Sequence, residues 1–446
     1  MSRNSFNPLS FQTRRDFLRT TVLGGALSWT VPSFLANTFA ALQAEAADKA
    51  TQTANGRDGS ILVVLQMAGG NDGLNTVVPF ANDHYQRARP RLALPESKLL
   101  KLNDDLALNS NLAGFKELFD AGQLGIVQGA GYPNPNRSHF RSTEIWQTAS
   151  DTDRFEQYGW LGRYFDNACA GSDPTVGVNV GRQMPQAFAA KTPTGVSLDN
   201  PQNYRFMPGR GSRGEAMETE TAYRKLNGVE PEMAENSGAT IGSLTGPVAH
   251  SGSPLDFLER TALEAQVSSD KIRAIAGRTQ TTGEYPGSPL GNSLKLVAKL
   301  IGGGLPARIY YVSQGGYDTH TNQLATQDRL LRELGDSVKA FVADMKAQGN
   351  LSRVLLMTFS EFGRRVAENA SGGTDHGAAA PMFVVGENLK AGLLGRYPSL
   401  APDDLFQGDL KYTVDFRAVY ATILERWLKT GSEKVLGRKF PTLDFV

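Results

Sequence analysis

The chain has 446 residues, 40% of them hydrophobic and 20% charged, which is typical of a globular protein with a large core and excludes a disordered or fibrous chain. Its 46 lysines and arginines balance 45 aspartates and glutamates. The resulting net charge of +1 excludes the broad positive field that holds nucleic acids or anionic membranes. The only cysteine is Cys169, so a disulfide within the chain is impossible.

The N-terminus has the pattern of a twin-arginine export signal. Arg14 and Arg15, in the sequence TRRDFL, precede an apolar stretch over 21–41, and Ala-Glu-Ala at 44–46 fits the requirement for signal cleavage. We therefore expect a signal peptide over 1–46 and a linker over 47–58. The twin-arginine translocation machinery would deliver the domain over 59–446 to the periplasm or the extracellular space. An uncleaved anchor is the alternative, but the apolar run is short and weakly hydrophobic for a stable membrane span.

The first half of the domain predicts strands followed by loops and helices. A continuous β-rich run over 61–67 ends in Gly-Gly-Asn-Asp-Gly, which indicates a strand buried on both faces and hence a parallel sheet. The spacing of apolar residues then predicts a helix over 110–121, a strand over 124–127 and a helix that follows a Pro/Asn loop and continues through Trp146.

The second half repeats this rhythm. The pattern predicts strands over 308–312, 354–358 and 381–385, a long amphipathic helix over 323–346 and a C-terminal helix over 414–429. Such alternation predicts a doubly wound α/β fold, with a mostly parallel sheet, helices on both faces and ligands at the carboxyl ends of the strands. Residues 201–290 are polar and rich in Gly and Ser, and we interpret them as an insertion or cap.

Three of the five histidines lie in loops that follow or flank predicted strands: His139, His320 and His376. His320 follows Asp318 by two residues, and His376 follows Asp375 directly. Imidazole and carboxylate together suit borderline divalent ions, and neighbouring glycines let the backbone turn closely around an ion. A single Asp-x-His is more often a hydrogen-bonded structural histidine, so the metal-site hypothesis depends on the order and spacing of all these pieces together.

Five segments resemble a known family. They are ILVVLQMAGGNDGLNTVVP at 61–79, GYPNPNRSHFRSTEIWQT at 131–148, GGYDTHTNQ at 315–323, FSEFGR at 359–364 and GTDHG at 373–377. They resemble the secreted bacterial family catalogued as domain of unknown function 1501, which is grouped by fold with the alkaline-phosphatase and sulfatase superfamily. Members of that superfamily hydrolyse or transfer phosphate and sulfate esters with one or two bound divalent metals. The resemblance therefore implies an exported metal-dependent ester hydrolase whose small substrate is unspecified.

The resemblance also implies roles for individual residues. One divalent ion, zinc-like or manganese-like, would be held tightly by Asp318, His320 and His376. A second, exchangeable ion would be held by Asp72, Glu361 and Asp375, whose oxygen ligands favour harder ions such as Mg²⁺, Ca²⁺ or Mn²⁺. Ser138, or His139 at the position nine residues before Thr148, would occupy the nucleophile position, and Arg137 or Arg364 would bind the non-bridging oxygens of the ester.

Departures from the superfamily pattern keep other hypotheses open. Gln66 stands where an aspartate is common at the end of the first strand, and Phe362 replaces an expected histidine ligand. These changes favour the alternative that the chain is a non-catalytic descendant acting as a periplasmic or cell-surface binding protein. A metal-independent serine hydrolase that uses Ser138 or Ser142 is a third hypothesis, although the chain has no Gly-x-Ser-x-Gly elbow after a predicted strand.

Overall fold

The computed structural model describes residues 59–170, 172–192, 194–201 and 268–446. The chain divides into two compact units, one of Met1–Ala36 with Tyr204–Asp270 and one of Asn37–Asn203 with Lys271–Val446. The fold reported below is that of the second unit. The expected signal peptide, the linker and most of the expected insertion over 201–290 lie outside the described residues.

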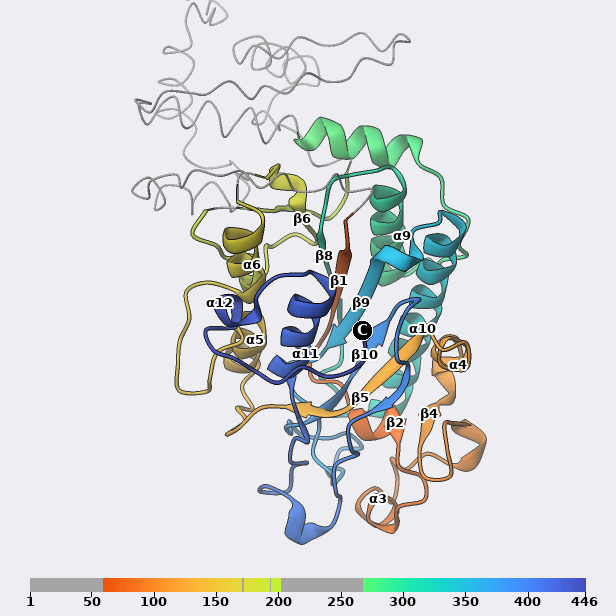
Figure 1. Ribbon diagram of the computed structural model, residues 1–446. Coiled ribbons are helices and arrows are strands. Elements are labelled where there is room, and N and C mark those ends of the chain that lie inside the picture. Colours follow the sequence, from red (N-terminus) through yellow and green to blue (C-terminus); the bar gives the residue numbers. More distant parts are fainter. Residues whose placement is uncertain (1–58, 171, 193, 202–267) are drawn as a thin grey trace, which may run out of the picture. The chain divides into compact units, whose positions relative to one another are not determined.

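In the described part of the chain, a nine-stranded mixed sheet forms the centre of this unit (Figure 1). Its strands are β1 Ile61–Ala68, β5 Leu124–Gly131, β6 Gly177–Val180, β7 Val196–Leu198, β8 Ile309–Gly315, β9 Val354–Phe359, β10 Ala380–Val385, β11 Gly392–Leu394 and β12 Val414–Asp415. Their order is β11-β5-β10-β9-β1-β8-β6-β7, and β12 also pairs with β5. Only β10 runs antiparallel to its neighbours β9 and β5, so the expected α/β class and mostly parallel sheet are confirmed.

Helices cover both faces of this sheet (Figure 1). The α-helices whose whole length is described are α3 Asp83–Ala88, α4 Ala113–Asp120, α5 His139–Thr148, α6 Trp160–Ala168, α9 Pro289–Gly302, α10 Gln323–Ala347, α11 Phe416–Thr422 and α12 Ser432–Leu436. A π-helical turn, Ile423–Trp427, continues α11, so the helix expected over 414–429 begins two residues later, after β12. A small antiparallel sheet, which the sequence did not predict, consists of β2 Val77–Val78, β3 Leu99–Lys101 and β4 Ala107–Asn109.

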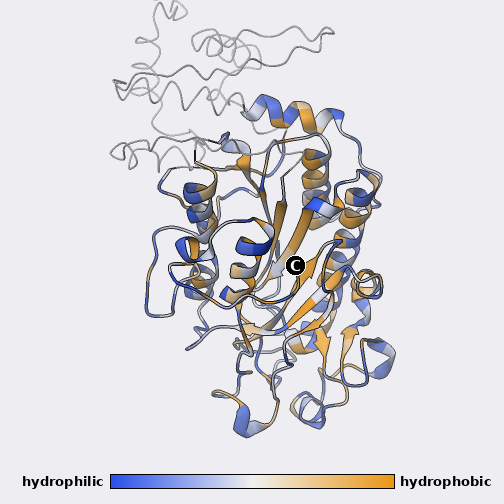
Figure 2. Ribbon diagram, viewed as in Figure 1, coloured by the Kyte–Doolittle hydropathy of each residue, from blue (hydrophilic) through white to orange (hydrophobic). Residues whose placement is uncertain are grey.

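The buried residues show how the sheet and the helices pack in layers. The first five residues of β1, Ile61 to Leu65, have no exposed surface, as expected for a central strand covered on both faces. On one face, aromatic rings of α5, α6 and α11 form the core: Trp146 stacks on Phe416 with centroids 4.2 Å apart, and Trp160 stacks on Tyr420 at 4.3 Å. In Figure 2 the central strands are mainly hydrophobic, whereas the helices carry hydrophilic patches.

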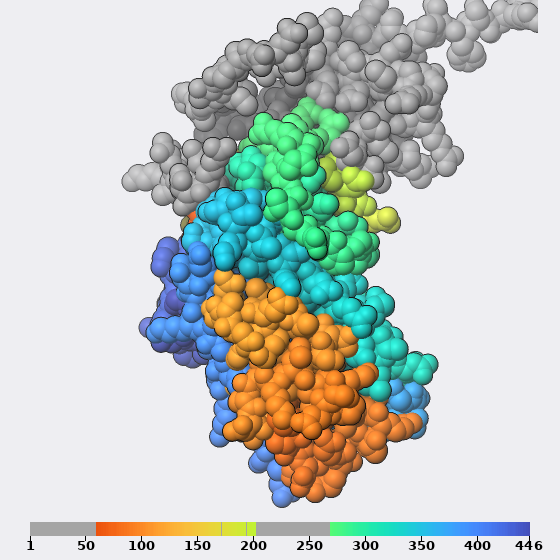
Figure 3. Space-filling model, turned by 90° about the vertical axis from the view of Figure 1, so that its right-hand side faces the viewer, coloured from red at the N-terminus to blue at the C-terminus, as the bar shows by residue number. Residues whose placement is uncertain are grey.

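The other face is covered by α4, α9 and α10. A Cβ atom on Gly114 of α4 would lie 2.5 Å from the carbonyl oxygen of Gly335 in α10, so the two helices approach as closely as their backbones allow. Figure 3 shows this side, with the N-terminal part of the described chain in orange beside the teal helices. In the described part of the chain, no helix has the length and apolar character that a membrane span requires.

The strand directions determine where the loops meet. β1, β5, β8 and β9 all run the same way, so the segments that follow them leave from one edge of the sheet. β10 runs the opposite way, so the segment that precedes it returns from the same edge. The loops over 69–76, 132–138, 316–322 and 360–379 therefore gather there, which is the edge where α/β sheets bind ligands.

Candidate metal centre

Three histidines and one aspartate from distant parts of the sequence meet at this edge. His139 is the first residue of α5, which follows β5. Asp318 and His320 lie in the loop between β8 and α10, and His376 lies between β9 and β10. We call these four residues the histidine cluster. Of the four histidines that the structure describes, only His84, on α3, lies outside it.

The Nε2 atoms of the histidines face one another and the carboxylate. The Nε2 atoms of His320 and His376 are 2.9 Å apart, and they lie 3.0 and 3.1 Å from Asp318 Oδ1. His139 Nε2 is 3.4 Å from Asp318 Oδ2. One ligand atom from each of His139, Asp318 and His376 lies within 4.8 Å of the other two, which is close enough for all three to bind one ion.

Each histidine uses its other ring nitrogen to contact an oxygen acceptor. His139 Nδ1 is 2.9 Å from Glu361 Oε1, and His320 Nδ1 is 3.2 Å from Asp375 Oδ1. His376 Nδ1 is 2.8 Å from the carbonyl oxygen of Arg137. A carbonyl or carboxylate oxygen accepts a hydrogen bond, so a proton on each Nδ1 would satisfy these contacts and leave the Nε2 atoms to ligate an ion. Such outer partners are typical of metal-ligating histidines.

The charges in the cluster fit a cation. Burial alone would raise the pKa of Asp318, but hydrogen bonds from Arg364 and His376 hold that pKa at about 2, so the carboxylate is ionised at neutral pH. Burial lowers the pKa of His376 below its ordinary value despite the contacts to Asp318 and the Arg137 carbonyl, which favours the neutral ring. Buried His139 Nε2 has no hydrogen-bond partner. Imidazole nitrogens and a carboxylate that converge in this way form a donor set that suits Zn²⁺ or Mn²⁺.

Arg364 positions the carboxylate of the cluster. Its Nη2 donates to Asp318 Oδ1 at 2.9 Å, and its side chain has no exposed surface. The backbone carbonyls that also accept from this guanidinium belong to Gly69, Gly70, Tyr317 and Thr374. Direct contact with a substrate, which the sequence led us to expect, would require Arg364 to leave these partners.

Glu361 is a partner of His139 rather than a member of the cluster. Its Oε1 accepts from Gly69 N at 2.8 Å and contacts His139 Nδ1, whereas its buried Oε2 has no partner. The resemblance in sequence predicted that Glu361 binds a second ion together with Asp72 and Asp375. Among the described residues, the structure does not bring these three together into a group that could share an ion.

Asp72 belongs to a separate buried network. Its Oδ2 accepts from Arg89 Nη1 at 2.5 Å and from Gln323 Nε2, and its Oδ1 accepts from Leu74 N at 3.2 Å. The side chains of Asp72 and Arg89 are both fully buried. The expectation that Asp72 is a metal ligand is therefore not supported by its position, because both carboxylate oxygens already have donors in the protein.

The expected nucleophile lies beside the cluster. Ser138 is exposed at the N-cap of α5, and its side chain makes no capping hydrogen bond. Its neighbours in the chain are His139 and Arg137, whose carbonyl contacts His376. Ser142, in contrast, is buried, and its hydroxyl bonds the carbonyl of Glu361, so this alternative nucleophile faces the interior.

Arg137 lies at the rim with a one-third exposed side chain. Its Nε donates to Asp409 Oδ2 at 2.8 Å and its Nη2 lies 2.6 Å from the same oxygen. Unlike Arg364, it is accessible from solvent next to the cluster. Its position agrees with the expected contact to ester oxygens, which remains a prediction.

Phe362 stands where a histidine ligand was expected, and its ring packs beside the imidazoles. The residue is 1% exposed, and its ring centroid lies 4.5 Å from that of His376 and 4.9 Å from that of His139. A Cβ atom on Gly70, which has φ +80°, would lie 2.2 Å from Phe362 Cε2. The ring therefore packs between a glycine turn and the imidazoles, and it adds an apolar wall to the cluster.

Sequence reasoning found all four members of the cluster but treated His139 as part of the nucleophile position. It missed the link between His139 and Glu361. The signal that favours this link is that Glu361 lies two residues after β9 and that His139 begins the helix after β5, because these two strands run the same way on either side of β10 and end at one edge of the sheet.

A profile of the family described as "Protein of unknown function (DUF1501)" matches residues 60–439. No curated protein sequence matches the chain. The structure is similar to that of the C-terminal periplasmic domain of EcEptC from Escherichia coli in complex with Zn (TM-score 0.33, 10% identity, covering 75% of this chain and 74% of that chain).

Two further solved structures show similarity of the same order. The PsFucS1 sulfatase from Pseudoalteromonas sp. has a TM-score of 0.32 and 12% identity, over 85% of this chain and 68% of the sulfatase. The alkaline phosphatase from the Antarctic bacterium TAB5 has a TM-score of 0.29 and 12% identity, over 74% of this chain and 92% of the phosphatase. At these values a function has to be inferred from the chain's own residues.

Proposed function

The chain belongs to the family of proteins of unknown function DUF1501, and we propose that it is an exported, metal-dependent hydrolase of phosphate or sulfate esters. The observation that supports this proposal most strongly is the direction of the three imidazoles. Each Nδ1 lies within hydrogen-bond distance of an oxygen atom, and each Nε2 lies 3.0–3.4 Å from a carboxylate oxygen of Asp318. Imidazoles whose Nδ1 atoms have oxygen partners and whose Nε2 atoms converge on one carboxylate have the arrangement typical of metal-ligating histidines.

The residues that would hold the ion are His139, His376 and Asp318, whose ligand atoms lie within 4.8 Å of one another. His320 is added to them because its Nε2 lies 2.9 Å from His376 Nε2 and 3.0 Å from Asp318 Oδ1. Three nitrogens and one oxygen form a borderline donor set that suits Zn²⁺ or Mn²⁺ better than the harder Mg²⁺ or Ca²⁺. When bound, such an ion supplies a Lewis acid that polarises an oxygen of the ester. Arg364 and Glu361 keep Asp318 and His139 oriented toward that position, as outer partners of metal ligands do.

Two residues at the rim are assigned to the substrate. Ser138 is the proposed nucleophile, because its hydroxyl is exposed and not engaged as a helix cap, and it stands between two residues that touch the cluster. Arg137 is assigned to the non-bridging oxygens, since its guanidinium is accessible and Asp409 holds it at a fixed position. Both assignments predict loss of turnover without loss of metal when either side chain is removed.

The test combines turnover with metal content. Protein prepared with ample Zn²⁺ and Mn²⁺ is assayed with 4-nitrophenyl phosphate and 4-nitrophenyl sulfate before and after dialysis against chelator. We expect hydrolysis of at least one ester, its loss after dialysis, and its loss in His376→Ala. His84→Ala is the matched control, because His84 lies on α3 outside the cluster and should leave both turnover and metal unchanged.

A metal-loaded protein that turns over neither ester would favour the alternative function, a binding protein derived from the same fold. Phe362 is the observation behind this alternative, because its ring occupies a place beside the imidazoles that a further ligand would need. Binding of phosphate or sulfate to the loaded protein without turnover is the result that would establish it.

Export is tested separately through the N-terminal arginines. Replacing Arg14 and Arg15 with Lys should trap the precursor in the cytoplasm, because paired arginines are read by the twin-arginine machinery as an address. Cell fractionation of the variant and the wild type measures this. Unchanged export of the variant would refute the twin-arginine route.

A further inference from the structure

An apolar groove adjoins the histidine cluster. It has a volume of about 390 Å³, which lies within the range of small-molecule sites. Residues that line it include Tyr132, Phe362, Phe406, Lys411 and Tyr412. Glycine and alanine at 131, 378 and 379 also line the groove, and a Cβ atom on Gly131 would lie 2.8 Å from Tyr412 Cβ.

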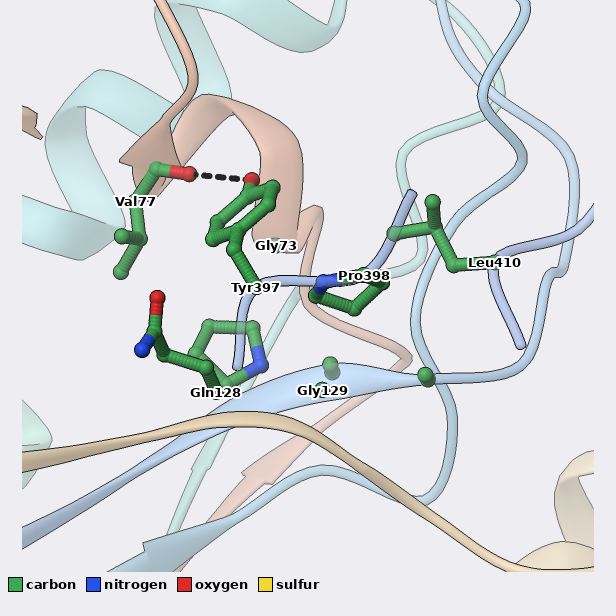
Figure 4. Close-up of a pocket in the computed structure, with 10 residues that line it drawn as sticks. Gly73, Val77, Gln128, Gly129, Tyr397, Pro398 and Leu410 are labelled. Atoms are coloured by element: carbon green, nitrogen blue, oxygen red, sulfur yellow. Dashed lines mark hydrogen bonds between the residues drawn. The ribbon is translucent and has the colours of Figure 1, made fainter. Parts of the chain in front are cut away.

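A neighbouring hollow is much smaller. The pocket in Figure 4 lies between Tyr397, Pro398 and Leu410 and has a volume of about 10 Å³, which is room for about one water molecule. The hydroxyl of Tyr397 donates to the carbonyl of Val77 across it at 2.8 Å. Of these two hollows, the groove is the one large enough for an organic group.

Two of the four aromatic residues that line the groove are exposed, whereas Tyr132 and Phe362 are buried. Phe406 is 42% exposed and Tyr412 is 39% exposed, and among the described residues only Phe140 and Phe155 are also exposed large hydrophobic side chains. Most other rings of the unit lie in the core. Exposed rings that face one hollow have a free apolar surface, which is a common feature of small-molecule sites.

Phe362 connects the groove to the cluster. The same ring that packs against His139 and His376 also lines the groove. Because Phe362 contacts two imidazoles and is also part of the groove lining, the apolar surface of the groove lies next to the cluster. Lys411 is the only charged residue of the groove lining, so most of this surface favours an apolar occupant.

We propose that the groove binds an apolar ring carried by the substrate, so that the chain prefers esters of ring-bearing alcohols over esters of small alkyl alcohols. This inference rests on the proposed function and specifies its substrate class. Phe406 and Tyr412 are the specificity-determining residues, and Phe362 forms the wall shared with the cluster. The ring gains affinity because its apolar surface leaves water and stacks on exposed aromatic side chains.

The test uses two phosphonates that cannot be hydrolysed. Binding of benzylphosphonate and of methylphosphonate to the zinc-loaded protein is measured by calorimetry, for the wild type and for Phe406→Ala and Tyr412→Ala. We expect the wild type to bind benzylphosphonate about 10-fold or more tightly than methylphosphonate, since a buried ring contributes that much. Each variant should lower this ratio about 2- to 10-fold without changing the affinity for methylphosphonate.

Phe155→Ala is the matched control. Phe155 is 79% exposed and lies over Arg141, outside the groove lining, so its removal should leave the ratio unchanged. Equal affinity of the wild type for the two phosphonates, no binding of benzylphosphonate, or a ratio that neither groove variant changes would overturn the proposal. A ring preference in a protein that hydrolyses no ester would support the groove and refute the proposed hydrolysis.

Discussion

Two polar clusters lie at the same edge of the sheet and differ in how their hydrogen bonds are satisfied. The network around Asp72 is fully buried and internally paired: Asp72 accepts from Arg89 and Gln323, and Arg89 also donates to the carbonyls of Arg365 and Val366. In the histidine cluster, the Nε2 atoms of His320 and His376 are 2.9 Å apart and both face Asp318.

This difference separates a structural role from a binding role. A buried charge pair with all its bonds made holds loops together and needs no ligand. Imidazole nitrogens that converge on one carboxylate share a proton or a cation among them, and a metal ion is the ligand that this arrangement suits. Both clusters contain the residue types of a metal site, so composition alone does not distinguish them, but the direction of the donors and acceptors does.

The largest effect is expected from breaking the Asp72 network. Arg89→Leu leaves the Asp72 carboxylate buried without its partner, which should lower the free energy of unfolding by about 3–5 kcal/mol. His376→Ala, measured in chelator, should cost about 1 kcal/mol, because the His376 side chain is partly exposed and its removal leaves no fully buried charge without a partner. Urea unfolding of the two variants provides the comparison. A larger loss of unfolding free energy in His376→Ala than in Arg89→Leu would mean that the histidine cluster, and not the Asp72 network, has the structural role.

The second prediction concerns stabilisation by metal. Zn²⁺ at about 100 times its dissociation constant should raise the free energy of unfolding of the wild type by about 2.7 kcal/mol, because the ion binds the folded chain. The increase should vanish in His376→Ala and persist in His84→Ala. Thermal or urea unfolding with and without Zn²⁺ measures it. Equal stabilisation of all three proteins would mean that the ion binds elsewhere.

The third prediction concerns the partner of His139. Glu361→Gln removes the charge that holds the His139 Nδ1 proton, and we expect it to weaken metal affinity by about 10- to 100-fold without abolishing binding. Glu368→Gln is the control, because Glu368 pairs with Arg91 away from the cluster. Competition with a chelating dye measures both affinities. An unchanged affinity in Glu361→Gln would show that the contact does not tune the ligand.

The smallest effect is expected for Asp375→Asn. Asp375 contacts His320 Nδ1 at 3.2 Å, but its side chain is 56% exposed, whereas that of Glu361 is 3% exposed. Solvent screens an exposed contact, so the affinity should fall less than about 10-fold. The same competition assay ranks the two variants. An effect of Asp375→Asn larger than that of Glu361→Gln would contradict the argument from burial.

The sequence predicted the parts of the fold that depend on local pattern. The apolar run of β1 and the glycine turn after it identified a central parallel strand. The helical spacing of apolar residues, kept over a long stretch, identified α10. It did not predict that β10 is antiparallel, because a short buried run such as Ala380–Val385 has the same composition in either direction.

The candidate site was predicted to a similar extent. Asp318, His320 and His376 meet as expected, because the loops that carry them leave one sheet edge. The pairing of Asp72 with Arg89 was not predictable, since nothing in the local pattern marks an arginine 17 residues away as its buried partner. The tautomer of each imidazole likewise depends on contacts from other loops, as with the Arg137 carbonyl and His376.

The central claim is that three imidazoles and one carboxylate hold a single ion. X-ray absorption at the zinc edge, on purified zinc-loaded protein, tests it most directly. We predict about one zinc per chain, with nitrogen and oxygen ligands at about 2.0–2.1 Å, scattering from three imidazole rings, and loss of the ion in His376→Ala. Protein without stoichiometric metal, or a coordination shell without imidazole, would contradict the account.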